Sequence, residues 1–160
     1  MKKKVAYFLA SYCGLGYSPV ASGTVGSLFT LPLVFVCAYY FGCVGVLGLS
    51  VIAFILGVWA SREVLKYTSH DPSLIVIDEV VGQSLTFVWL ADNLVGNAQA
   101  LPVYLFGFAF FRLFDIWKPQ PVRWADQKLI NAWGVMLDDV FAGIFAAIVL
   151  LGIWLIQVHI

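Results

Sequence analysis

Five apolar stretches follow one another along the chain, separated by short polar or glycine-containing segments. They cover residues 28–41, 44–60, 74–91, 100–114 and 134–156. Long apolar runs are typical of membrane-embedded helices, because a helix satisfies its own backbone hydrogen bonds where no water is available. The pattern therefore predicts an all-α fold, a polytopic membrane helical bundle with about five membrane-embedded helices.

Several of these stretches are short for a membrane span. Fourteen or fifteen apolar residues rise only ~21–23 Å as a helix, whereas the hydrocarbon core of a bilayer is ~30 Å thick. We therefore expect polar flanking residues to extend the helices, or the first pair to enter the bilayer incompletely. Gly42 and Cys43 separate that pair and are expected to form a tight turn.

The N-terminus combines lysines at positions 2–4 with a short apolar run. Gly14, Gly16 and Pro19 follow without the small-residue cleavage site of a secretory signal peptide. We therefore expect residues 3–13 to form a basic amphipathic helix that lies on the membrane surface.

Composition supports a membrane protein. Hydrophobic residues make up 62% of the 160 residues and charged residues only 11%. A soluble domain usually carries about 25% charged residues, so this chain has too little polar surface to coat a water-soluble globule. No linker divides it, and residues 1–160 are expected to form one membrane-embedded domain. The net charge of zero argues against nucleic acid as a partner, and the three cysteines lack a metal-ligand or disulfide pattern.

The distribution of charge predicts an orientation. If the N-terminus is cytoplasmic and five helices alternate sides, every Lys and Arg falls at or near the cytoplasmic face, as the positive-inside rule requires. Asp92 falls on the outer side. The carboxylates expected at or just below the cytoplasmic face are those of Asp71, Asp78, Glu79, Asp115, Asp126, Asp138 and Asp139. Segments far apart in the sequence thus bring acids to one depth.

Two adjacent acid pairs, Asp78-Glu79 and Asp138-Asp139, interrupt apolar runs. A carboxylate inside a membrane helix costs about 2.5–3.5 kcal/mol and is functional by default, although one acid in each pair could simply cap a helix. Two such pairs at matching depths repel unless a cation lies between them. Oxygen-only ligands favour Mg²⁺ or Mn²⁺ over zinc.

Arg112, Asp115 and Lys118 form a third polar group near the end of an apolar stretch. Arg112 and Asp115 are i,i+3 neighbours on one helix face. A guanidinium fork and an ammonium are suited to gripping phosphate. The alternative is a cation that extends its charge to the membrane surface and makes an exposed ion pair.

A Gly/Ser-rich segment over residues 14–28 leads into the first long apolar stretch. Backbone N–H groups at such a helix start form an anion site, although Ser22 or Thr24 could merely cap the helix. Its candidate phosphate-binding residues are Gly23, Thr24, Gly26 and Ser27. His70 and Asp71, before the third stretch, are candidates for orienting the residues that touch the metal or the phosphate, and Asp71 before proline could instead only begin a turn.

Taken together, four segments resemble the phosphatidylglycerophosphatase A family. They are residues 18–28, residues 70–71 together with 75–82, residues 111–121 and residues 134–143. Together they cover about a third of the chain, in the same order as in the family. Two departures lie beside these motifs: Ser22 stands where the family often has proline, and Ala132-Trp133 stand where glycine is common. They affect expectations about loop geometry more than the expected activity.

The resemblance implies a Mg²⁺-dependent phosphatase that removes the terminal phosphate of phosphatidylglycerophosphate, an anionic phospholipid. The implied location is the bacterial inner membrane, with the site facing the cytoplasm. We expect Glu79, Asp139 and at least one of Asp78, Asp115 and Asp138 to hold the metal. Arg112, Lys118 and loop N–H groups would hold the phosphate.

The residues leave several alternatives open. The attacking group is either a metal-activated water or one aspartate, which would form an aspartyl-phosphate. A small ion or proton transporter would also use intramembrane carboxylates, but it predicts acids along a continuous path near mid-bilayer. A noncatalytic assembly subunit would not need clustered acids.

Overall fold

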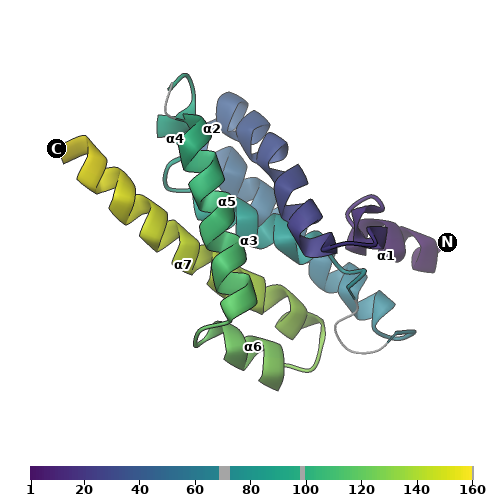
Figure 1. Cartoon of the computed structure of the whole chain (residues 1–160). Coiled ribbons are helices and arrows are strands. Elements are labelled where there is room, and N and C mark those ends of the chain that lie inside the picture. The colour runs from purple at the N-terminus through teal and green to yellow at the C-terminus, as the bar shows by residue number, and fades with distance from the viewer. Residues whose placement is uncertain (69–72, 98–99, 160) are drawn as a thin grey trace.

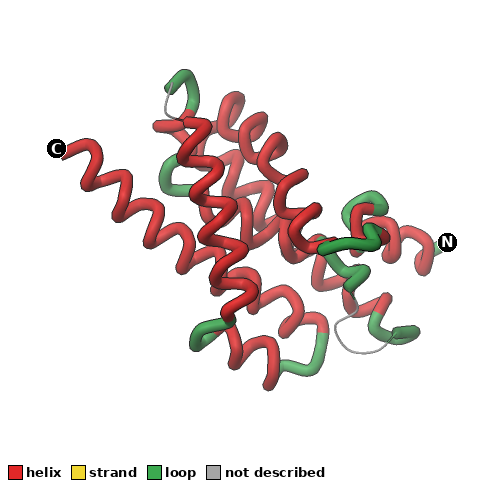
Figure 2. Tube along the Cα trace, viewed as in Figure 1, coloured by secondary structure: helices red, strands yellow, loops and turns green. Residues whose placement is uncertain are grey.

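The computed structural model describes residues 1–68, 73–97 and 100–159, and this part of the chain contains helices and loops without a strand. The all-α prediction is confirmed. The elements are α1 (Lys2–Ala10), η1 (Leu15–Tyr17), α2 (Ser22–Val64), α3 (Ile77–Phe87), α4 (Ala91–Leu94), α5 (Ala100–Trp117), α6 (Val122–Lys128) and α7 (Ala132–His159). Short connections join the helices into one bundle (Figure 2).

The longest element, α2, is a helical hairpin. Gly42 has non-helical backbone angles (φ 60°, ψ −150°) and divides α2 into arms over residues 22–41 and 43–64. The second arm runs back toward the start of the first (Figure 1). Accordingly, Gly26 lies against Val76, and a Cβ at Gly57 would lie 3.2 Å from the Ile77 side chain. The predicted turn at Gly42 is confirmed.

Asp92 of α4, which lies outside the hairpin, stabilises this turn through a hydrogen bond. Its Oδ1 accepts a hydrogen bond from the Cys43 backbone N–H at 2.9 Å, which satisfies one of the donors that a helix start leaves unpaired. A Cβ at Gly42 would overlap the Asp92 carboxylate. Asp92, which the sequence places apart from the other acids, therefore has a structural role at the turn of the hairpin.

The short helix α3 lies at the centre of the bundle and packs against α2, α5 and α7. The sequence predicted a helix over residues 74–91, but the observed one covers 77–87, or ~16 Å. Nine of its eleven residues are buried. Because other helices surround it, α3 does not need the length of a lipid-facing span.

Helices α3 and α7 approach through two glycines. A Cβ at Gly143 would lie 2.9 Å from Gly82 Cα, and a Cβ at Gly82 would lie 2.6 Å from the Asp139 carbonyl oxygen. Small residues allow such close packing between membrane helices. The contact places the first turn of α3 beside Asp138 and Asp139 of α7.

Among the described residues, three helices are long and apolar enough to cross a membrane: α2, α5 and residues 132–157 of α7. Each arm of α2 has about twenty residues, or ~30 Å, so the hairpin accounts for two of the predicted five membrane helices. Large apolar side chains such as Phe41, Ile55 and Leu101 are exposed on these helices. In a bilayer, these side chains would face lipid.

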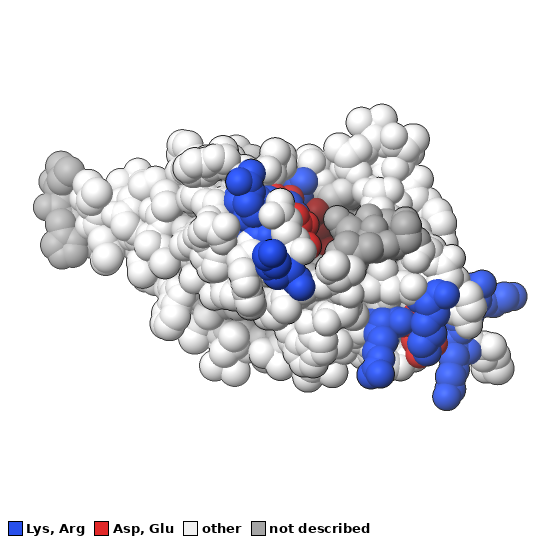
Figure 3. Space-filling model, turned by 90° about the horizontal axis from the view of Figure 1, so that it is seen from below, with Lys and Arg blue, Asp and Glu red and all other residues white. Residues whose placement is uncertain are grey.

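Helix α1 ends three residues before the predicted boundary, because Tyr12 and Cys13 adopt left-handed backbone conformations. Its Ala10 carbonyl accepts a hydrogen bond from the Val76 N–H at 2.8 Å, which joins α1 to the segment leading into α3. Lys and Arg side chains gather on the face seen in Figure 3, and acidic side chains are visible in a hollow beside one of the basic groups. The sidedness of this face in a membrane stays a prediction.

The turn at Gly42 generates a stability prediction. Gly42→Ala forces alanine into a positive-φ conformation (φ 60°, ψ −150°) that is essentially restricted to glycine and displaces Asp92, so we expect a loss of about 1–3 kcal/mol in the free energy of unfolding. Gly48→Ala, in the second arm of α2, is the control, because a Cβ there meets nothing within 4 Å. Thermal unfolding in detergent, followed by circular dichroism, measures both. Equal unfolding temperatures for the two variants would contradict the role of the turn.

Candidate functional site

Three carboxylates from three helices meet at one point. Glu79 of α3, Asp115 of α5 and Asp139 of α7 each offer an oxygen within 4.8 Å of the others. Glu79 is 7% exposed and Asp139 3%. The prediction that separate helices bring acids together is therefore confirmed for these three residues, which we call the acid triangle. Their roles as metal ligands stay a prediction.

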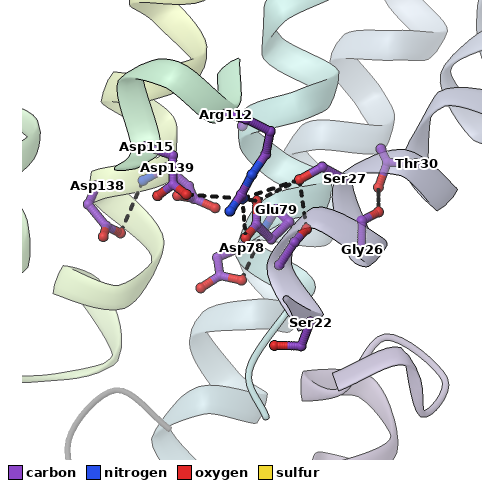
Figure 4. Close-up of polar contacts among 12 residues, drawn as sticks. Ser22, Gly26, Ser27, Thr30, Asp78, Glu79, Arg112, Asp115, Asp138 and Asp139 are labelled. Carbon is purple, nitrogen blue, oxygen red and sulfur yellow. Dashed lines mark hydrogen bonds and ion pairs between the residues drawn. The ribbon is translucent and has the colours of Figure 1, made fainter. Parts of the chain in front are cut away.

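The guanidinium of Arg112 lies against the acid triangle. Its Nη1 is 2.6 Å from both carboxylate oxygens of Glu79 and 3.0 Å from Asp115 Oδ2. Figure 4 shows Arg112 between Ser27 and Glu79 on one side and Asp115 and Asp139 on the other. One guanidinium leaves the negative charge of three carboxylates incompletely balanced. Its Nε is buried and has no hydrogen-bond partner within the described part of the chain.

The beginning of α2 supports Glu79. Ser27 Oγ lies 2.8 Å from Glu79 Oε2 and 2.8 Å from the Gly23 carbonyl oxygen, so its single proton is donated to one or the other. A Cβ at Gly23 would overlap the Glu79 carboxylate. Gly23 therefore allows α2 to approach α3, and Ser27 gives Glu79 a hydrogen-bond donor.

The Gly/Ser-rich segment was predicted to bind phosphate, and its residues differ in whether they line the cavity. Gly23 lines the cavity described below, whereas Thr24, Gly26 and Ser27 are not among its lining residues. Gly26 lies against Val76. Ser22 lines the cavity and donates a hydrogen bond to the Ser73 carbonyl oxygen at 2.7 Å. Sequence reasoning did not identify the contact of Ser27 with Glu79, because it joins residues 52 positions apart.

The two acid pairs have the same local geometry. Asp78 Oδ1 accepts a hydrogen bond from the Glu79 N–H, and Asp138 Oδ1 accepts one from the Asp139 N–H, each at 3.0 Å. The second acid of each pair belongs to the acid triangle. This arrangement follows from the ~100° between adjacent helical residues, which turns one member toward the centre and leaves the other beside it.

Lys118 forms a second charged group beside the acid triangle. Its Nζ lies 2.9 Å from Asp138 Oδ2 and 2.5 Å from Asp126 Oδ1. Burial alone would lower the pKa of the Lys118 ammonium, but the charges of Asp138 and Asp126 raise that pKa above its ordinary value. Lys118 is therefore positively charged at neutral pH. Asp126 was not among the predicted site residues, because no spacing pattern relates it to Lys118.

These groups surround a cavity of about 350 Å³. Its lining residues are Ala21, Ser22, Gly23, Ser73, Ile75, Asp78, Glu79, Arg112, Asp115, Ile116, Lys118, Asp138 and Asp139. A larger cavity between α5 and α7, of about 550 Å³, has a lining without acidic or basic residues. Of these two cavities, the smaller one is therefore the one lined by charged side chains. His70 and Asp71 lie outside the described residues.

Comparisons with known proteins identify one family, and one of the relatives carries a different substrate name. The family model described as phosphatidylglycerophosphatase A matches residues 8–154. The chain is similar to phosphatidylglycerophosphatase A of Escherichia coli K12 (33% identity over 88% of this chain and 78% of the relative). It is also similar to that of Haemophilus influenzae (37% identity, 92% and 87%). A Bacteroides thetaiotaomicron protein provisionally named phosphatidylinositol-3-phosphatase shares 34% identity over 86% of each chain. No solved structure matches.

The contact between Ser27 and Glu79 generates a prediction about cation binding. Ser27→Ala removes a hydrogen-bond partner that orients Glu79, and loss of such a partner typically weakens metal binding by about 10–100-fold, so we expect Mn²⁺ to bind at least about ten-fold more weakly. Isothermal titration in detergent measures the affinity. Thr30→Ala is the control, because the Thr30 hydroxyl donates to the Gly26 carbonyl of its own helix and Thr30 is not among the residues that line the cavity. An unchanged affinity in Ser27→Ala would show that Ser27 does not support the acid triangle.

Proposed function

The chain belongs to the phosphatidylglycerophosphatase A family and is a phosphoric monoester hydrolase, and on that premise we propose that it hydrolyses phosphatidylglycerophosphate in a Mg²⁺-dependent reaction. The products are phosphatidylglycerol and inorganic phosphate. The observation that carries the proposal is the acid triangle of Glu79, Asp115 and Asp139. It brings three carboxylate oxygens close together beside Arg112 and Lys118, the two cationic side chains that line the cavity.

The donor set of the acid triangle fits Mg²⁺. All three side chains are carboxylates, the hard oxygen ligands that Mg²⁺ binds, commonly together with water and substrate phosphate. Arg112 balances part of their charge. A divalent cation would balance the two negative charges that remain, which lowers the cost of keeping three carboxylates close together in an apolar bundle.

The side chains around the cavity divide the work of phosphate transfer. Arg112 and Lys118 line the same cavity and would hold the nonreacting phosphate oxygens, whose charge must be stabilised as the P–O bond to the lipid breaks. Asp78 and Asp138 also line the cavity and are candidate proton acceptors for an attacking water. When bound, Mg²⁺ neutralises phosphate charge and lowers the pKa of water. An aspartyl-phosphate route through one of the cavity carboxylates is the alternative.

We further propose that the site faces the cytoplasm from a bacterial inner membrane. Support comes from the cationic side chains at the end of the bundle that carries the site (Figure 3), as expected from the positive-inside rule. The transporter alternative requires acids along a continuous path. The acid triangle instead concentrates three acids at one end, and Asp92 at the other end caps α2.

Removal of charge from the acid triangle is expected to abolish phosphate release. Glu79→Gln and Asp139→Asn each remove a proposed metal ligand, so we expect at least about a 100-fold loss of kcat. Phosphate release from phosphatidylglycerophosphate in mixed micelles measures the effect, and circular dichroism checks the fold. Glu63→Gln is the control, because its exposed ion pair with Lys66 lies outside the cavity. Near-normal turnover in both site variants would refute their assigned roles.

Chelation tests the metal requirement. EDTA is expected to stop phosphate release, and added Mg²⁺ is expected to restore it, because the acid triangle would lose and regain its cation. The same assay with phosphatidylinositol 3-phosphate compares the substrates named for the relatives. Full activity in EDTA would remove Mg²⁺ from the proposal, and faster turnover of the phosphoinositide would replace the proposed substrate.

A further inference from the structure

Lys118 stands where α5 ends, and carboxylates from two different helices hold its ammonium. Asp138 of α7 lines the cavity, whereas Asp126 of α6 is not among the lining residues. Nevertheless, Asp126 makes the shorter contact, 2.5 Å against 2.9 Å. The cavity wall therefore contains a cation whose position depends on a residue outside the cavity.

Lys118 has an unusual backbone conformation, which sets the direction in which its side chain leaves α5. Its φ of 49° is left-handed, a conformation that non-glycine residues adopt only at a cost. Its N–H still donates to the Phe114 carbonyl at 2.9 Å and completes the last turn of α5. The side chain thus leaves the helix end on a flexible four-carbon stem, and its partners determine where the ammonium lies.

Helix α6 supplies a fixed partner. Val122 and Ala125 of α6 are fully buried, and Val122 belongs to a hydrophobic cluster with Phe111 of α5 and Ala142 of α7. Asp126 follows Ala125 directly, so its carboxylate is held by an anchored helix. Its side chain is 27% exposed, and the ion pair with Lys118 is therefore only partly shielded from solvent.

We propose that Asp126 is a positioning residue that holds the Lys118 ammonium at the cavity wall, where it meets the phosphate of the substrate. This role rests on the proposed function. Without Asp126, the ammonium would be free to leave the wall or would pair with Asp138 alone. Both changes weaken the contact between Lys118 and phosphate. In the first the ammonium moves away from the phosphate, and in the second Asp138 competes more strongly for the ammonium.

The test is a comparison of KM and kcat for phosphatidylglycerophosphate in mixed micelles. In Asp126→Asn we expect KM to rise about five-fold while kcat changes less than about two-fold. Asp126→Glu, which retains the charge, should restore most of the affinity. Glu63→Gln removes a carboxylate from another Lys pair of 2.5 Å and should change neither constant. An unchanged or lowered KM in Asp126→Asn overturns the proposal.

A double-mutant cycle separates positioning from a merely structural role. In a Lys118→Met background, Asp126→Asn should add no further rise in KM, because the group that it positions is gone. An equal rise in both backgrounds overturns the proposal. Unfolding temperatures identify a variant that fails to fold, and titration with inorganic phosphate measures the same coupling without the lipid. Retained activity in Glu79→Gln would instead count against the proposed function, whatever Asp126 does.

Discussion

The close contact of α3 with α7 determines where the acid triangle lies. Gly82 and Gly143 bring the two backbones so near that a Cβ on either would overlap the other helix. The acids in the first turn of α3 and those of α7 consequently lie side by side. Packing energy from the apolar helices holds carboxylates together that would otherwise repel. The site is thus a product of helix packing and not of one local motif.

The acids that gather at this end are stabilised by different cations. Arg112 contacts Glu79 and Asp115, whereas Lys118 contacts Asp126 and Asp138. The two groups share one cavity wall, so a change in either alters the field that a bound phosphate meets. This division explains why a chain with so few charged residues concentrates most of its acids at one end and uses Asp92 to fasten the opposite turn.

The sequence predicted the acids, Arg112 and the turn at Gly42, because each interrupts a long apolar run where a polar or flexible residue stands out. It could not predict the contact of Ser27 with Glu79 or the contact of Asp126 with Lys118. Both depend on how helices distant in sequence pack. The predicted helix over residues 74–91 was too long, since hydropathy does not distinguish a helix surrounded by protein from one that faces lipid.

The shortness of α3 has a consequence for how a lipid substrate would reach the cavity. Glu79 is the third residue of α3, and Asp115 is the third from the end of α5. Both lie within about 5 Å of a helix end along its axis. Under the proposed function, a head group would enter the cavity while its acyl tails stay in their own leaflet. Turnover would then require no vertical extraction of the phospholipid, and the product would return to the monolayer from which the substrate came.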